Sequence, residues 1–183
     1  MKKASFERNI NWYKYYIVFS GALFIWPIEV LFFKDRGLSF TNIMVIESII
    51  SMVQLILEIP SGILGDKIGC KKTVLLGLIS QIFAYIILLF NSSLLGAYVY
   101  SILLACGYAF VSGADTALIY ESHKILKKEN DYGKTLRSAG SIKMFALAFV
   151  SLISGVLYKI NLNIPYLLSI VFLFIAFVFI LTF

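Results

Sequence analysis

The sequence predicts an all-α polytopic membrane protein with six transmembrane helices. Of its 183 residues, 60% are hydrophobic and 14% are charged, and the mean hydropathy is +0.90. This composition excludes an ordinary soluble domain, in which about a quarter of the residues are charged. A helix needs about 20 apolar residues to cross the hydrocarbon core of a bilayer. Six windows qualify, and none shows the period-2 alternation of barrel strands: 11–33, 41–64, 73–91, 94–120, 136–158 and 163–183.

The first three windows differ in their polar content. The first is too long for the apolar core of a signal peptide and lacks a small-x-small cleavage site, so we expect it to stay in the membrane. It contains Pro27 and Glu29, and the second window contains Glu47, Glu58 and Pro60. We expect the two prolines to interrupt their helices, because proline removes a backbone hydrogen bond. The third window contains no charged residue.

The next three windows repeat this order. The fourth contains Asp115 and the fifth Lys143, whereas the sixth is apolar on every face, which suits a helix largely surrounded by lipid. Small residues between Gly107 and Ala117 give the fourth window a side that another helix can approach closely. The order of two polar windows and one apolar window, seen twice, predicts two inverted three-helix repeats, an organisation found in many secondary transporters.

The basic residues predict the orientation. Three Lys or Arg residues, Lys34, Arg36 and Lys159, lie on one side of the predicted membrane. Twelve lie on the other: Lys2, Lys3, Arg8, Lys14, Lys67, Lys71, Lys72, Lys124, Lys127, Lys128, Lys134 and Arg137. Cytoplasmic segments carry the excess of Lys and Arg, so we expect both termini in the cytoplasm and place the protein in the plasma membrane of a bacterium. The net charge of +6 is then a topology signal, and nucleic acid is not expected as a partner.

Apart from Lys14 and Arg137, which lie near window ends and are counted above, five charged residues fall inside the windows and are the candidates for substrate binding or ion coupling. By depth, Glu29 and Glu47 lie toward the outer side, and Glu58, Asp115 and Lys143 toward the cytoplasmic side. A charge at this depth is costly and faces a partner or a wet cavity, so we expect these residues to line the interior of the bundle. Lys143 has two candidate partners, Asp115 and Glu58. The alternative for each acid is a purely structural contact between helices.

The segment GILGDKIGCKK, residues 62–72, joins the second and third windows. Asp66 lies at the C-terminal end of a helix, where the macrodipole disfavours an anion, and Lys71 is one of the lysines that can compensate it. Gly62 and Gly69 permit close approach and a tight reversal of the backbone. These four residues form a candidate gating loop; the alternative is a short basic loop that only fixes topology.

This segment resembles the loop between helices 2 and 3 of the major facilitator superfamily, whose form is G-x-L-A-D-R-x-G-R-K. The matching positions are Gly62, Leu64, Gly65, Asp66, Lys67, Gly69 and Lys71. The stretches LEIPSG and SGADTALIYES resemble a drug-efflux-like branch of that family. The resemblance implies that Gly62 is a close-packing position, Asp66 a latch carboxylate and Lys71 a latch cation of the outward-facing state. Cys70 departs from the usual basic residue, and the fourth window lacks the Arg often found in proton antiporters.

The resemblance implies secondary active transport of a small molecule by alternating access, in the direction of efflux. Residues 1–183 would be the N-terminal six-helix half of a twelve-helix transporter. The second half would be missing by truncation, carried by another chain, or replaced by a second copy of this one. The expected partners are the lipid bilayer, a small-molecule substrate and that second half. The alternatives are a membrane scaffold or assembly partner without transport, and a non-functional fragment.

An enzyme is not expected. The sequence has no metal-ligand spacing, no paired nucleophile and base, and no phosphate-binding loop of an ATP-driven pump, and it suggests no cofactor. We expect the single histidine, His123, to be a solvated loop residue.

Overall fold

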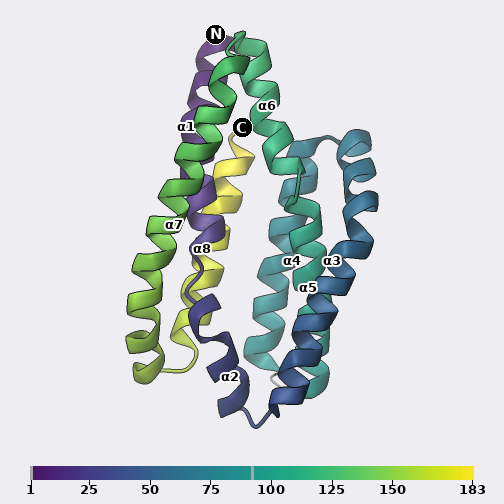
Figure 1. The fold of residues 1–183 in the computed structure, drawn as a ribbon, viewed down its shortest axis with the longest axis vertical. Helices are drawn as coiled ribbons and strands as arrows, with labels where there is room; N and C mark the ends of the chain where they lie inside the picture. Colours follow the sequence, from purple (N-terminus) through teal and green to yellow (C-terminus); the bar gives the residue numbers. More distant parts are fainter. Residues whose placement is uncertain (1, 92) are drawn as a thin grey trace.

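The computed structural model describes residues 2–91 and 93–183, which form a bundle of helices (Figure 1). Six helical segments are long and apolar enough to cross a membrane, which confirms the all-α prediction. We number them spans 1 to 6 in chain order: Phe6–Asp35, Phe40–Ile68, Cys70–Phe90, Leu94–Leu126, Glu129–Ile160 and Ile164–Leu181.

Span 1 is broken in its middle. Helix α1 (Lys2–Gly21) ends before a short irregular stretch, and the 3-10 turn η1 (Trp26–Ile28) leads into α2 (Glu29–Asp35). The predicted interruption near Pro27 is therefore present. The break exposes backbone groups that need partners inside a membrane. One is supplied by α8 (Ile164–Leu181), where the Ser169 hydroxyl accepts a hydrogen bond from the Ile25 amide at 3.2 Å.

Span 4 is broken as well, between α5 (Leu94–Val111) and α6 (Ala114–Leu126). Gly113 at the break has a φ of +77°, a conformation that residues with a Cβ adopt rarely. The α6 helix then starts from the Gly113 carbonyl, which accepts from the Ala117 amide at 2.9 Å. Spans 1 and 4 are the first helices of the two predicted three-helix repeats, so the breaks occupy corresponding positions.

Spans 2 and 3 are continuous. Helix α3 (Phe40–Ile68) passes through Pro60, so the predicted interruption of span 2 is wrong. It turns at Gly69, whose φ is +94°, directly into α4 (Cys70–Phe90). Proline costs one hydrogen bond, and the rest of this 29-residue helix tolerates that loss.

The segment between the fourth and fifth predicted windows, residues 121–135, is largely helical. Helix α6 runs to Leu126 and α7 (Glu129–Ile160) begins two residues after Lys127, which turns the chain with a φ of 57°. The predicted solvated position of His123 is also wrong, because its side chain is only 1% exposed. Its Nδ1 lies 3.0 Å from the Ile119 carbonyl, to which it donates, and its Nε2 accepts from the Thr135 hydroxyl at 3.1 Å. The polar composition of this segment reflects helix ends, not a loop.

The backbones of α4 and α5 approach each other closely in the core of the bundle. A Cβ added at Gly77 would lie 2.8 Å from the Gly107 carbonyl oxygen, and one at Gly107 would lie 2.5 Å from Gln81 Cγ. This confirms the prediction of a smooth surface around Gly107. The Ser80 hydroxyl donates to the Leu103 carbonyl at 2.6 Å across the same interface. The two helices can approach this closely because neither glycine carries a side chain.

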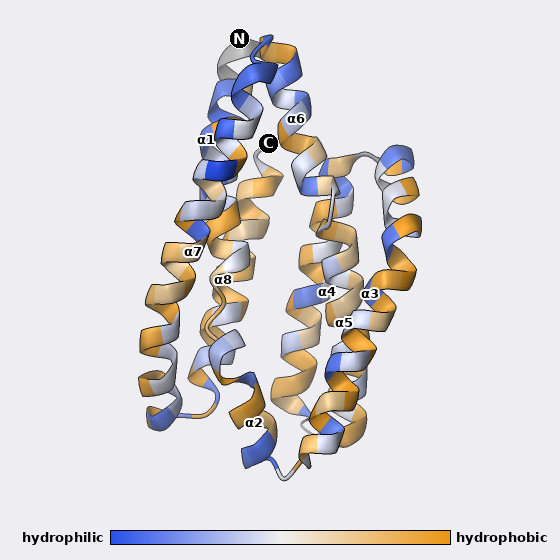
Figure 2. Cartoon of the chain, viewed as in Figure 1, coloured by the Kyte–Doolittle hydropathy of each residue, from blue (hydrophilic) through white to orange (hydrophobic). Residues whose placement is uncertain are grey.

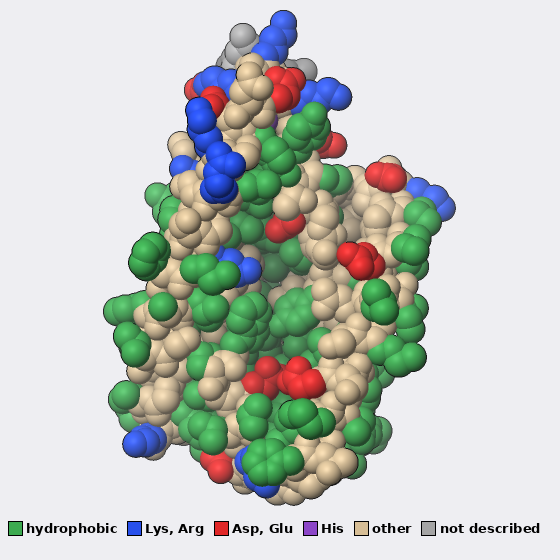
Figure 3. Space-filling model, in the orientation of Figure 1, with side chains coloured by type: hydrophobic (Ala, Val, Ile, Leu, Met, Phe, Trp, Pro, Cys, Tyr) green, Lys and Arg blue, Asp and Glu red, His purple; other side chains and the backbone are tan. Residues whose placement is uncertain are grey.

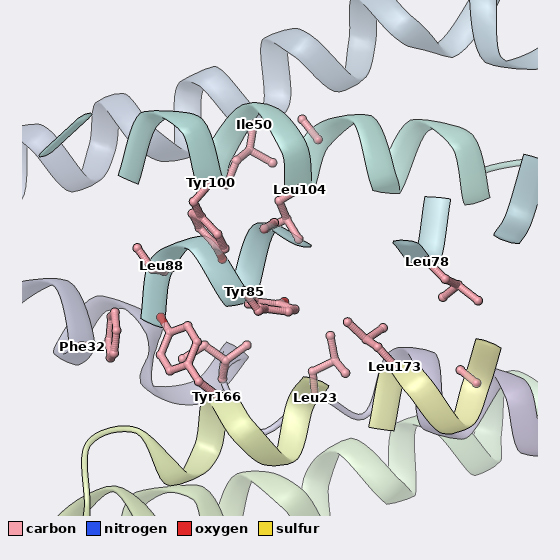
Figure 4. Close-up of a cluster of buried hydrophobic side chains, with 14 of the residues drawn as sticks. Leu23, Phe32, Ile50, Leu78, Tyr85, Leu88, Tyr100, Leu104, Tyr166 and Leu173 are labelled. Carbon is pink, nitrogen blue, oxygen red and sulfur yellow. The ribbon is translucent and has the colours of Figure 1, made fainter. Parts of the chain in front are cut away.

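Aromatic residues fill the space between these helices and α8 (Figure 4). The Tyr85 ring lies 5.8 Å from that of Tyr100 and 5.9 Å from that of Tyr166, and Phe32 packs 4.0 Å from Tyr166. Span 6 packs against this core along one side only, since 33% of its 18-residue window is buried, so a helix largely surrounded by lipid stays a prediction. One stripe of α8 is buried against α1 and α4, and it includes the small residues Ser169 and Ala176. The other members of this stripe are Tyr166, Leu173 and Ile180.

The two chain ends lie at the same end of the bundle (Figure 1). Apolar residues dominate the long outer surfaces, whereas hydrophilic residues gather at the two ends (Figure 2), as expected for a structure that crosses a membrane. The least buried spans are α7 and α3, which lie at opposite flanks of the face seen in Figure 1.

The α4–α5 contact yields a stability prediction. We expect Gly107→Ala to lower stability by about 1–3 kcal/mol, since the added methyl group overlaps Gln81 and the Gly77 carbonyl. Gly140→Ala on α7 is the matched control, because a Cβ there meets nothing within 4 Å. Thermal unfolding in detergent micelles measures both changes. Equal melting temperatures for the two variants would contradict the proposed contact.

Candidate functional site

A pocket of about 360 Å³ lies beside the break in span 1, and we call it the acidic pocket. It is lined by α3, α5 and the segment from η1 into α2. Figure 3 shows acidic side chains within the hollow of this face. The lining residues are Trp26, Glu29, Val30, Glu47, Ile50, Leu104 and Tyr108. The structure thus brings together Glu29 and Glu47, which the sequence placed at a similar depth on neighbouring spans.

The break in span 1 positions Glu29. The residue lies in the first turn of α2, where the positive end of the helix dipole favours a carboxylate. The Tyr100 hydroxyl of α5 donates a hydrogen bond to Glu29 Oε1. Glu47 projects from α3 into the same pocket. Two acids at one apolar pocket can bind a proton or another cation, because a cation offsets the cost of placing negative charge there.

Aromatic residues complete the acidic pocket, and the sequence analysis missed them. The Trp26 indole Nε1 donates to the Tyr108 hydroxyl at 3.1 Å, which ties η1 to α5. Tyr100, Leu104 and Tyr108 are spaced four residues apart and so share one face of α5. That spacing could have predicted a shared face, but most neighbouring residues in the fourth window are also apolar, so the spacing does not stand out. Aromatic faces beside carboxylates provide a suitable environment for an organic cation.

Asp115 and Lys143 lie elsewhere in the bundle. Asp115 is in the first turn of α6, just after the break in span 4. It is near enough to Lys143 of α7 and Tyr16 of α1 for electrostatic interaction, but it forms no salt bridge with Lys143. The salt bridges among the described residues are Glu7–Lys128 and Asp131–Lys134.

The path of the Lys143 side chain depends on a glycine. A Cβ added at Gly21 would overlap the Lys143 methylene groups, so the end of α1 makes room for that side chain. Its ammonium group lies 5.9 Å from the centre of the Trp26 ring. Lys143 therefore crosses over the break in span 1 toward the acidic pocket, and the predicted ion pair with Asp115 or Glu58 is not formed.

Glu58 differs from the other candidates. It is exposed on α3 and does not line the acidic pocket. The expectation that all five charges face the interior therefore does not hold for Glu58. One helical turn separates it from Gly62, which is also exposed.

The four residues of the candidate gating loop have different surroundings. A Cβ at Gly62 would meet nothing within 4 Å, so Gly62 packs closely against no described residue. Asp66 is exposed in the last turn of α3 and has no hydrogen-bond or ion-pair partner among the described residues. Gly69 makes the turn. Lys71 points back into the bundle, where its Nζ donates to the Leu181 carbonyl at the end of α8 at 2.8 Å. The lysine compensates a helix C-terminus, and it does not compensate Asp66.

Among the described residues, no group of three or more His, Cys, Asp or Glu side chains could hold a metal ion.

The hydrogen bond between Tyr100 and Glu29 can be tested by a double-mutant cycle. We expect Tyr100→Phe to destabilise the protein by about 1–3 kcal/mol, because the partly buried Glu29 carboxylate loses its donor. The loss should be much smaller in a Glu29→Gln background, which gives a measurable coupling energy. Tyr98→Phe is the control, since Tyr98 lies on the same helix but does not line the acidic pocket. Additive losses in chemical denaturation would show that the two side chains do not interact.

Comparison with known proteins gives two findings. A family model described as Major Facilitator Superfamily matches residues 15–183. A curated relative, the uncharacterized MFS-type transporter YxaM of Bacillus subtilis (strain 168), is 24% identical over 152 residues. The aligned region covers 83% of this chain and 37% of that relative, so the chain spans well under half of the relative's length.

Proposed function

Because this chain belongs to the major facilitator superfamily, a family of secondary transporters and not of enzymes, we propose that it forms the N-terminal six-helix half of a transporter for a small molecule. The observation that carries the proposal is the meeting of Glu29 and Glu47 at one pocket beside the broken span 1. In this proposal the substrate crosses by alternating access, in the direction of efflux. The sequence stretches LEIPSG and SGADTALIYES support that direction through their resemblance to efflux proteins.

The two broken spans support the placement of the transport path. Interrupted helices at corresponding positions of two repeats mark the substrate sites of many transporters, because irregular backbone is tolerated in a membrane only where it lines a cavity or is buried in protein. Glu29 follows the break in span 1, and Asp115 follows the break in span 4. We propose that both acids and Glu47 belong to one transport path. The positive charge of Lys143 then offsets part of the negative charge of that path.

The charges of the path favour a substrate that carries positive charge. Glu29, Glu47 and Asp115 outnumber the one cation, Lys143, and Trp26 and Tyr108 add aromatic faces. A cavity with this charge attracts cations and repels anions. We propose an amphipathic organic cation, exchanged for protons that the same carboxylates bind.

The surfaces left open in the bundle support a second half. The outer faces of α3 and α7 are the least buried, and Asp66 and Gly62 lie at one end of the α3 face without partners among the described residues. We propose that the second half packs on these two faces and that Asp66 meets it as a gating contact. Lys71 serves as the anchor that joins the loop to α8. Glu58, exposed on the same helix, belongs to this interface in our proposal.

The position of the basic residues supports the orientation. The chain termini, the turn at Gly69 and the turn at Lys127 share one end of the bundle (Figure 1), and Lys and Arg side chains gather at that end (Figure 3). We propose that this end faces the cytoplasm of a bacterial cell.

The transport proposal is tested by flux in vesicles that contain the protein as its complete gene encodes it. We expect a pH gradient to drive movement of ethidium, an amphipathic cation. Glu29→Gln and Glu47→Gln should each lower the rate about tenfold or more, since a charge-assisted contact is worth about 1.5–3 kcal/mol. Glu121→Gln, at an exposed position on α6, is the matched control.

Three outcomes separate the alternatives. Flux that both pocket variants leave unchanged would remove the acidic pocket from the path. Gradient-driven flux of neutral or anionic compounds alone would keep transport but overturn the substrate class. A folded protein that moves none of these compounds would favour the scaffold function.

A further inference from the structure

A groove of about 320 Å³ lies on the side of α1 that faces away from the core, and we call it the basic groove. It is lined by Asn11, Lys14, Tyr15 and Val18 of α1 and by Ile142 of α7. On α1 these residues alternate with Tyr13 and Tyr16, which are buried in the core. Helical periodicity therefore places the basic groove on the outer, lipid-facing surface of the bundle.

Aromatic contacts fix the depth of the basic groove. The Tyr15 ring stacks on Phe179 with centroids 5.7 Å apart, and Trp12 packs edge-on against the same ring at 5.5 Å. Phe179 is in the last turn of α8, which ends at Leu181. The basic groove thus lies near the level of the turn between α3 and α4, because Lys71 after that turn contacts the Leu181 carbonyl. We take this level, where charged residues follow the apolar runs, as the one where lipid headgroups meet acyl chains. Tyrosine and tryptophan are enriched at this level.

The groove is positively charged through Lys14, and no described residue compensates that charge. Lys14 has no hydrogen-bond or ion-pair partner among the described residues. The acids that form salt bridges among the described residues pair with other lysines, Glu7 with Lys128 at 3.0 Å and Asp131 with Lys134 at 2.9 Å. Arg8 lies nearer the end of α1, with its guanidinium 5.1 Å from the centre of the Trp12 ring. A cation at the membrane boundary extends toward the headgroups, where an anion is the favourable partner.

We propose that the basic groove binds the headgroup of an anionic phospholipid. Lys14 and the Asn11 amide contact its phosphate, and Tyr15, Val18 and Ile142 lie beside the upper part of its acyl chains. Basic pockets between membrane helices are suited to such headgroups. The apolar wall of the groove favours a lipid over a free anion. A bound phosphate ion would leave this wall without a contact, whereas the acyl chains of a lipid would cover it. The basic groove is separate from the acidic pocket and serves to hold α1 and α7 together at the membrane surface.

The test uses tryptophan quenching. The chain has two tryptophans, and Trp26→Phe leaves Trp12 as the single reporter close to the basic groove. This variant is placed in phosphatidylcholine vesicles that contain either brominated phosphatidylglycerol or brominated phosphatidylcholine at the same mole fraction. We expect an apparent affinity about fivefold higher for the anionic lipid, in line with one lysine near a charged surface.

Substitutions identify the residue responsible. Lys14→Gln should abolish the preference, and Lys14→Arg should keep it, which separates loss of charge from misfolding. Lys72→Gln, at an exposed position after α3, is the control that should leave the preference unchanged. The proposal is overturned if Lys14→Gln keeps the preference, or if Lys72→Gln removes it to the same extent. Relief of quenching by inorganic phosphate would identify a site for a soluble anion and would also overturn the lipid proposal.

Discussion

Every backbone amide and carbonyl inside a membrane needs a hydrogen-bond partner, and the two broken spans show how this chain meets that constraint. A continuous helix supplies the partners by itself. Span 1 instead opens before Trp26, and the Ser169 hydroxyl of α8 accepts from the exposed Ile25 amide. Span 4 opens at Gly113, where a positive φ lets the chain restart as α6. The membrane tolerates these breaks only because other helices surround them. The local geometry of spans 1 and 4 and the packing of α5 and α8 therefore depend on each other.

The breaks also bring charge into the bundle. Each one creates a new helix N-terminus, and each new N-terminus carries an acid in its first turn: Glu29 in α2 and Asp115 in α6. A carboxylate is better tolerated there than in the middle of a continuous apolar helix. The Tyr100 hydroxyl and the aromatic residues of α5 then surround Glu29. The same feature that interrupts the span thus positions the group that gives the pocket its chemistry.

The segment around the turn after span 2 presents one side to the interior of the bundle and the other to its outer surface. Lys71 faces inward and holds the end of α8 through the Leu181 carbonyl oxygen. Asp66 and Gly62 are exposed, and Asp66 has no hydrogen-bond or ion-pair partner among the described residues. A segment that is anchored on one side and open on the other can transmit a contact with a second domain to the bundle. The resemblance to the family pattern implied that all of these residues act together, but geometry divides them between an internal anchor and an external surface.

The sequence by itself determined the helix class, the six spans and the end at which the basic residues gather, because these depend on composition and on the length of apolar runs. It also paired Glu29 with Glu47 by depth, since a helix rises by a fixed distance per residue. It failed for His123 and Pro60, and it did not identify the buried stripe of span 6. A polar helix end has the composition of a loop, a long helix tolerates one proline, and a uniformly apolar helix does not reveal which stripe is buried.

The tertiary structure alone decided which residues meet around the pocket, where the lysines at 71 and 143 point, and which faces stay open. Those outcomes depend on the rotation of each helix about its axis, which is set by contacts such as Gly77 against Gly107 and not by the hydropathy of either helix.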